Sequence, residues 1–195
     1  MHKLSNEVLD QLFYKSRTLN NFKDIPVSDE TLKELYSLTS MGPTAFNAQP
    51  LRLLFVKSPE AKEKLRSTLM PGNVDKTMKA PINVIIATDY SFPELLYKTF
   101  PVADVKPLFA GNQAMTDVTA FRNSTLAGGY FIAAAHALGL DVGAMSGFNN
   151  DLVDQLFFEK TNIKSNFIVN LGYGDYANIQ ARLPRLSFEE TSQII

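Results

Sequence analysis

Residues 119–145 read TAFRNSTLAGGYFIAAAHALGLDVGAM and decide the fold class. Apolar side chains on nearly every side of residues 119–138 predict a long helix that is buried on most of its faces. The apolar run from Leu126 to Leu140 is too short for a membrane span and contains His136 and three glycines. A short apolar strand, Val142 to Met145, follows at once. We therefore expect the central helix of a globular domain and no membrane partner.

The flanking sequence predicts further strands and helices around this helix. Strands are expected at 52–57, 82–88 and 166–171. A helix is expected to begin at Ser28, with Val27 and Leu32 as a hydrophobic staple. Further helices are expected to begin at Ser58-Pro59, at Asn149 and at a capping box formed by Ser187 and Glu190. Residues 90–116 carry Pro93, Pro101 and Pro107, so we expect irregular structure or broken helix there. Helices alternating with about four strands imply a sheet that is covered on both faces, in a single domain over residues 1–195.

The composition argues against several classes of function. A net charge of −1 leaves no broad basic face, so we expect no nucleic acid partner. The absence of cysteine removes thiol nucleophiles and thiolate metal sites, and it leads us to expect a cytoplasmic protein. The two histidines, His2 and His136, cannot build a usual zinc site without cysteines, and His136 is expected to be a buried or interface residue. The sequence has neither a G-x-S-x-G elbow nor a Walker loop.

One glycine pattern imitates a dinucleotide-binding fingerprint. Gly172, Gly174 and Ala177 follow a predicted strand with the relaxed spacing of that motif. The motif requires a helix next, and then a second strand with an acidic residue about 20 residues on. Here the chain turns polar, meets Pro184 and ends at Ile195. We therefore interpret the pattern as a glycine-rich turn leaving the sheet.

Five short segments carry residues suited to a planar, phosphorylated ligand. They are Arg17-Thr18-Leu19-Asn20, Gly42 to Pro50, Asn73 to Lys76, Gly143 to Phe148, and Arg182 to Arg185. A cation, a hydroxyl and an amide in the first segment can hold a phosphate and one edge of a heterocycle. Asn73 and Lys76, three residues apart, share a helix face. The small residues of the second and fourth segments let backbone approach a ligand closely.

In this order and at these separations, the five segments resemble those of the nitroreductase family of flavoproteins. The resemblance runs from about Leu12 to Glu190. Within the family, the sequence is most similar to the RutE-type malonic semialdehyde reductases. The similar stretches are Pro26 to Leu32, Ala120 to Ser124, Met145 to Phe148, Gly172 to Asp175 and Arg182 to Glu190. The resemblance implies an α+β, nitroreductase-like sandwich with a mixed sheet, a homodimer, and FMN bound between the subunits. The C-terminal tail from Tyr176 to Arg185 has few apolar residues, and we expect it to extend over the partner subunit.

The resemblance also implies which residues hold the FMN phosphate and ribityl end. Arg17 and Thr18 would contact that end of the cofactor, and Arg182 would complete the phosphate site. Asn20 would face the N1/O2 edge of the ring. The family often has basic residues where this sequence has Ser16, Asn20 and Gln180. Cations are therefore missing from the site, and Arg185 is placed to compensate.

The remaining implied contacts are to the flavin ring. Pro43, Thr44 and Asn47 would come from the partner subunit and line the flavin. Asn73 and Lys76 would hydrogen-bond the pyrimidine edge, with Lys76 favouring negative charge near N1.

The loop after the third strand would complete these ring contacts. Met145 would also contact the cofactor, the backbone N–H of Ser146 would point at N5, and that of Gly147 at O4. Leu51 stands where the family often has tryptophan, and it is expected to be a core residue.

The function implied is hydride transfer from NADH or NADPH, through flavin N5, to a small acceptor. The flavin carries this chemistry, so no side chain is expected to be catalytic in its own right. The branch implies reduction of malonic semialdehyde to 3-hydroxypropionate, with Arg122 a candidate for the acid group or for an interface ion pair. A broad reductase of nitroaromatics, quinones or enones, a non-catalytic flavin-binding protein and a plain structural module are the alternatives. The sequence does not decide between NADH and NADPH.

Overall fold

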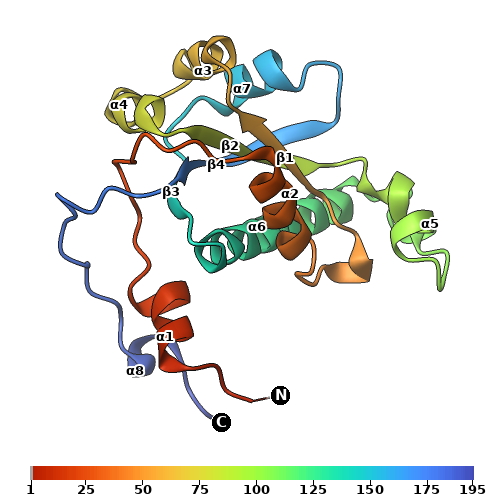
Figure 1. Ribbon diagram of the computed structural model, residues 1–195. Helices are drawn as coiled ribbons and strands as arrows, with labels where there is room; N and C mark the ends of the chain where they lie inside the picture. Colours follow the sequence, from red (N-terminus) through yellow and green to blue (C-terminus); the bar gives the residue numbers. More distant parts are fainter. Residues whose placement is uncertain (1) are drawn as a thin grey trace.

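The computed structural model describes residues 2–195 and is built around a sheet of four strands (Figure 1). The strands are β1 (Leu51–Val56), β2 (Ile82–Asp89), β3 (Asp141–Met145) and β4 (Ile163–Gly172), and their spatial order is β1-β2-β4-β3. All four predicted strands are confirmed, although β4 begins earlier than the predicted 166–171. β3 lies at one edge of the sheet, which leaves one of its sides open for the N-terminal segment.

The mixed sheet expected for the four strands is wrong, because every ladder between them is antiparallel. Within residues 2–195, parallel pairing occurs at an isolated bridge between Thr18 and Val142, where the N-terminal segment runs beside β3. Strand direction depends on how each connection returns the chain to the sheet. The local apolar pattern, from which the strands were predicted, does not encode that direction.

Helices cover both faces of the sheet (Figure 1). They are α1 (Asn6–Leu9), α2 (Asp29–Thr39), α3 (Pro59–Arg66), α4 (Pro71–Lys79), α5 (Leu96–Thr99), α6 (Gln113–Ala137), α7 (Asn150–Phe157) and α8 (Phe188–Thr191). α2 and α6 cover one face, and α3, α4 and α7 cover the other. The long helix α6 begins at Gln113 rather than at Thr119, because the Asn112 side chain accepts a hydrogen bond from the Met115 N–H and caps it.

The other predicted helix starts are confirmed by their caps. The side chains of Ser28, Ser58, Asn149 and Ser187 each accept a hydrogen bond from the backbone N–H three residues on. The Ser187–Glu190 capping box is complete, since the Glu190 side chain also accepts from the Ser187 N–H. Val27 and Leu32, the predicted staple, are both buried in the core. Capping is local chemistry, which is why the sequence predicted these boundaries.

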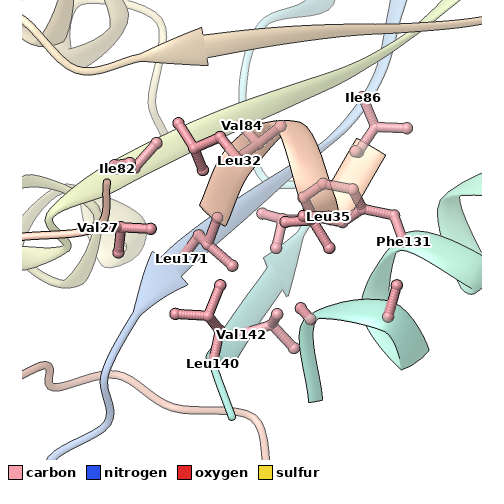
Figure 2. Close-up of a cluster of buried hydrophobic side chains, with 13 residues drawn as sticks. Val27, Leu32, Leu35, Ile82, Val84, Ile86, Phe131, Leu140, Val142 and Leu171 are labelled. Carbon is pink, nitrogen blue, oxygen red and sulfur yellow. The ribbon is translucent and has the colours of Figure 1, made fainter. Parts of the chain in front are cut away.

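β2 is buried along its whole length and supplies side chains to a core on each face. Val84 and Ile86 point to the face covered by α2 and α6, where Leu35 and Phe131 pack against them (Figure 2). Ile85 points to the opposite face. Alternation along an extended strand produces this division. Each fully buried side chain of this size stabilises the fold by roughly 1.5–3 kcal/mol.

Residues 90–112 form short helical turns and one short helix rather than a continuous element, as predicted, whereas residues 113–116 belong to α6. The turns span Phe92–Leu95 and Lys106–Leu108, on either side of α5. Phe92 and Phe109 pack edge to face, with ring centroids 5.1 Å apart. This aromatic cluster packs the short helical turns of the segment together.

The two ends of the chain project from the body of the molecule (Figure 1). The apolar residues of the N-terminal segment are largely exposed, with Phe13 57% accessible. The C-terminal tail lies against this N-terminal segment of the same chain, since Arg182 donates a 2.9 Å hydrogen bond to the Tyr14 carbonyl. Among the described residues, no helix combines the length and apolar character that crossing a bilayer requires.

Candidate functional site

The open edge of β3 positions the first predicted segment. The Leu19 N–H donates a 2.9 Å hydrogen bond to the Val142 carbonyl, and the Leu19 side chain is buried. Gly143 is required here, because a Cβ at that position would lie 2.5 Å from the Leu19 carbonyl oxygen. With Leu19 turned inward, Thr18 and Asn20 are left on the exposed side of this edge. The structure therefore brings the first and fourth segments together.

The loop after β3 is joined to α4, which brings in the third segment. The Asn73 side chain donates a 2.8 Å hydrogen bond to the Gly147 carbonyl, and the Met70 N–H donates to the same oxygen at 3.1 Å. One turn further along α4, the Thr77 hydroxyl lies 3.5 Å from the Met145 sulfur. Lys76 is half-buried and forms no salt bridge within residues 2–195. Its ammonium group is available to a ligand.

Three arginines gather beside this edge, where the C-terminal tail crosses the N-terminal segment. Arg17 donates a 2.5 Å hydrogen bond to the Gln180 carbonyl, and Arg182 donates one of 2.5 Å to the Ser16 carbonyl. Arg185 donates to carbonyls of its own turn. With Thr18, Ala144 and the tail, these arginines line a hollow of about 390 Å³. The fifth segment therefore joins the first.

The electrostatics of this hollow fit an anion. Within residues 2–195, none of the three arginines forms a salt bridge with a carboxylate. Their hydrogen bonds go to backbone carbonyls, which leaves their positive charge uncompensated. A phosphate group is a strong partner for guanidinium groups. The hollow therefore fits the phosphate end of FMN.

The backbone after β3 fits the ring end of the same cofactor. The N–H groups of Ser146 and Gly147 have no hydrogen-bond acceptor within the described part of the chain. Ser146 is exposed and Gly147 is half-exposed, so both can meet a ligand. Unpaired N–H groups of this kind can donate to ring nitrogen or oxygen atoms. Together with Asn73 and Lys76, they form the polar side of the candidate site.

The second segment does not join the others in a single chain. Pro43, Thr44 and Asn47 lie in the loop between α2 and β1, on the α5 side of the molecule and away from α4 and the tail (Figure 1). This loop lines a separate hollow of about 720 Å³, with apolar walls that include Leu51, Leu53 and Phe55. One chain thus presents two incomplete surfaces rather than one closed site.

This loop is strained. Phe46, Asn47 and Gln49 all have positive φ angles, of 53°, 47° and 45°. Such conformations cost residues other than glycine about 1 kcal/mol or more each. They persist only where the surroundings hold them, and they gather at functional sites. The loop between Pro43 and Pro50 therefore presents a fixed backbone surface that includes three residues in the left-handed region.

Contacts from α6 and from the α5 region hold the loop in place. The Ala45 N–H donates a 2.8 Å hydrogen bond to the Asn123 side chain, and the Asn47 side chain donates one of 2.7 Å to the Thr99 carbonyl. Phe46 packs edge to face against Phe100, with ring centroids 5.7 Å apart. Asn123 could not be assigned a role from the sequence, because these partners are far apart in the chain and follow no local spacing.

A second group that the sequence analysis missed lies under the tail. The Asp141 carboxylate accepts hydrogen bonds from the Tyr176 hydroxyl and, at 2.9 Å, from the Gly174 N–H. Burial and then Asp141 raise the pKa of Tyr176 to about 12, while nearby Arg17 acts in the opposite direction. These hydrogen bonds attach the glycine-rich turn after β4 to Asp141 at the start of β3. The turn therefore has a structural role, as expected for a pattern that is not a dinucleotide fingerprint.

The model of the nitroreductase family matches residues 15–173. The chain is 53% identical over 194 residues to a Burkholderia lata protein with the provisional name NADH dehydrogenase/NAD(P)H nitroreductase, and the alignment covers 100% of both chains.

Two solved structures share the fold at low sequence identity. A provisionally named nitroreductase from Exiguobacterium sibiricum, solved in complex with FMN, matches with a TM-score of 0.86 at 16% identity and covers 100% of both chains. A provisionally named NAD(P)H:FMN oxidoreductase from Staphylococcus epidermidis matches with a TM-score of 0.82 at 20% identity, again over 100% of both chains. At these identities the likeness establishes the fold.

Proposed function

The chain belongs to the nitroreductase family, and from that premise we propose that it is an FMN-dependent oxidoreductase that takes hydride from NADH or NADPH and passes it to a small acceptor. The family, the provisional names of its relatives and the FMN complex of a structural neighbour support the class of reaction. The lack of cysteine fits a cytoplasmic enzyme of this kind.

One observation carries the proposal. Four of the five predicted segments meet along the open edge of β3, although they are separated by up to about 165 residues of sequence. They place uncompensated guanidinium groups at one end, and free N–H groups with an amide and an ammonium group at the other. This distribution suits a flat heterocycle that ends in a phosphate.

The side chains have distinct tasks in this proposal. Arg17 and Arg182 bind the phosphate and fix the position of the cofactor, while Thr18 and Asn20 face it from the strand edge. When bound, FMN supplies the hydride-transfer chemistry. Lys76 places positive charge on the ring side and favours negative charge that develops there. The N–H groups of Ser146 and Gly147 orient the ring edge, so that donor and acceptor meet it in a fixed geometry.

The second surface leads us to propose a homodimer. The strained loop at Thr44 and Asn47 cannot serve the Arg17 half-site of its own chain, but a second copy can present it. The outer face of α6 carries exposed apolar side chains on which a copy can pack, namely Val118, Phe121, Leu126 and Tyr130. The complete site then contains residues from both copies, and the tail is available to contact the partner.

Mixing two defective variants tests the proposed site. Arg182→Ala and Asn47→Ala are each expected to lose flavin, and purified mixed dimers are expected to regain about half of the wild-type flavin content. A mixed dimer has one site with both residues intact only if each site takes these residues from different chains. If mixed dimers stay colourless while wild-type protein binds flavin, the composite site is wrong. If wild-type protein binds no FMN, the proposed function is wrong.

For the acceptor we propose malonic semialdehyde, which is reduced to 3-hydroxypropionate. A short carboxylate substrate needs a cation near the site, and Arg122 is exposed on α6 and forms no salt bridge within the described residues. It is the neighbour of Asn123, which holds the strained loop. Arg122→Gln is expected to raise the KM for the semialdehyde about tenfold and to leave the KM for a neutral quinone unchanged. Equal effects on both acceptors would remove this role.

The hollow beside the strained loop favours a second candidate, a broad reductase of nitroaromatics, quinones or enones. Tyr36, Leu53 and Phe55 on its walls suit apolar, planar acceptors. Steady-state assays with both acceptor classes separate the candidates, because the semialdehyde must give the higher kcat/KM if it is the physiological substrate. Rapid bleaching of the protein's flavin by NADH without oxygen would exclude a non-catalytic flavin-binding protein.

A further inference from the structure

His136 lies beside the three arginines, a placement that its position in a run of alanines does not indicate. It is near the C-terminal end of α6 and is 7% exposed. Together with Ser16, it borders both the arginine hollow and an adjoining hollow of about 320 Å³. The other histidine of the chain, His2, is exposed near the N-terminus. The function described above makes no use of this side chain.

The geometry of the imidazole leaves one nitrogen for a ligand. Its Nδ1 lies 3.2 Å from the Leu140 carbonyl oxygen. A carbonyl can only accept, so Nδ1 carries a hydrogen and donates it. Nε2 has no hydrogen-bond partner in the described chain. It is not fully enclosed by protein atoms. The nitrogen that takes up the second proton therefore has access to the space beside the ring.

The charges around His136 are mostly positive. Arg17, Arg182 and Arg185 share its first hollow, and Lys15 shares the second. Lys15 is paired with Asp10, at 2.7 Å. The acidic groups facing it are Asp141, whose carboxylate is already engaged by two donors, and the hydroxyl of Tyr176. A phosphate dianion bound in the hollow would therefore favour the protonated form of the His136 imidazole.

We propose that His136 is a further phosphate-binding residue of the flavin site, which donates from Nε2 when protonated and thereby makes FMN affinity depend on pH. The proposal rests on the proposed FMN function. It explains how the site compensates for Ser16 and Gln180, which stand where the resemblance implied cations. A histidine in that role supplies its charge only while the ring is protonated.

The direction of the pH dependence follows from linkage. In the free protein, burial lowers the pKa of His136, while the Leu140 carbonyl and Asp141 partly oppose this effect. Phosphate in the hollow raises that pKa again, so binding takes up a proton. His136 therefore strengthens FMN binding as pH falls. The phosphate itself loses charge below its second pKa of about 6. That effect is common to wild type and variants, so ratios of dissociation constants between them isolate the histidine.

Flavin titrations of His136→Asn test the proposal. Asparagine can keep the donor to the Leu140 carbonyl and lacks the second nitrogen. Its FMN dissociation constant is expected to exceed the wild-type value about tenfold near pH 6 and about twofold near pH 8. Riboflavin, which has no phosphate, is expected to bind both proteins equally at each pH. Addition of inorganic phosphate with riboflavin reports whether the hollow binds phosphate from any source.

A spectroscopic measurement tests the same point without comparing affinities. With only two histidines in the chain, NMR can follow each ring, and His2 serves as the internal reference. The pKa of His136 is expected to rise with FMN and to stay unchanged with riboflavin.

If His136→Asn does not fold, His136→Gln takes its place in the flavin titrations. Glutamine offers a neutral donor, so this variant is expected to bind FMN without the added pH dependence.

An unchanged ring pKa with FMN, or an FMN affinity ratio that does not vary with pH, overturns the inference. Failure to bind FMN and riboflavin at every pH would instead contradict the proposed function, so the two failures are distinguishable.

Discussion

The side-chain amide of Asn73 donates a 2.8 Å hydrogen bond to the backbone carbonyl of Gly147, and so ties α4 to the loop after β3. A Cβ on residue 147 would lie 2.3 Å from the Asn73 amide nitrogen. Two predicted ring contacts therefore depend on each other. The amide nitrogen of Asn73 donates one hydrogen to Gly147 and keeps its second hydrogen and its oxygen for a ligand.

Gly147→Ala is expected to displace Asn73 and weaken flavin binding at least about tenfold, with a smaller loss of stability. The matched control is Gly72→Ala on α4, where a Cβ has no neighbour within 4 Å. Fluorescence titration with FMN and thermal unfolding measure the two effects. Equal affinities for the two variants would contradict the proposed coupling.

The adjacent glycines of α6 are expected to respond oppositely to alanine. A Cβ at Gly128 would lie 2.6 Å from the Phe167 ring, whereas one at Gly129 meets open space. Gly128→Ala is expected to lower the free energy of unfolding by about 1–3 kcal/mol. Gly129→Ala is expected to raise it by up to about 1 kcal/mol through helix propensity. Chemical denaturation measures both, and destabilisation of similar size at both positions would refute the packing explanation.

Lys76→Met is expected to slow the bleaching of the protein's flavin absorbance by NADH about tenfold or more, because positive charge on the ring side is lost. Lys79→Met, on the same helix, is the control and is expected to behave like wild type. Anaerobic stopped-flow absorbance gives both rates. An unchanged rate for Lys76→Met at full flavin occupancy would remove the assigned role.

Arg182→Ala is expected to weaken FMN binding about tenfold to a hundredfold, because a charge-assisted contact to phosphate is lost. Riboflavin binding is expected to change far less, which separates loss of the phosphate contact from a general loosening of the tail. Arg66→Ala, a surface change on α3, is the control. Equal weakening for both flavins would place the effect of Arg182 in the tail rather than in the phosphate site.

Tyr176→Phe is expected to remove part of the pH dependence of stability at alkaline pH. The ordinary pKa of 10.0 is raised to about 12 in the fold, so the unfolded chain loses this proton first. Stability is then full below pH 10 and falls as pH rises toward 12. Unfolding of the flavin-free protein across this range measures the slope, with the exposed Tyr97→Phe as control. The same slope in wild type and Tyr176→Phe would contradict the shift.

The four strands and the four helix starts predicted from caps were confirmed because their causes are local. Ser28 and Asn149 cap helices through hydrogen bonds to backbone three residues on, and β2 alternates between two cores along its own length. The direction of strand pairing was wrong, because it depends on the return path of each connection. The fifth segment was predicted to hold phosphate from the resemblance, and its place beside Ser16 and Arg17 supports that prediction.

Sequence alone determined most of the elements, the family and the residue types proposed for the candidate site, since periodicity, capping and motif order are all encoded along the chain. Only the tertiary structure decided which of those residues meet. Thr18 reaches Val142, and Asn73 reaches Gly147, through contacts between distant segments. The strained loop at Asn47 stays apart from them, and His136 lies among the arginines. Contacts between residues far apart in the chain depend on how the helices and the sheet pack together, and no local sequence spacing specifies that packing.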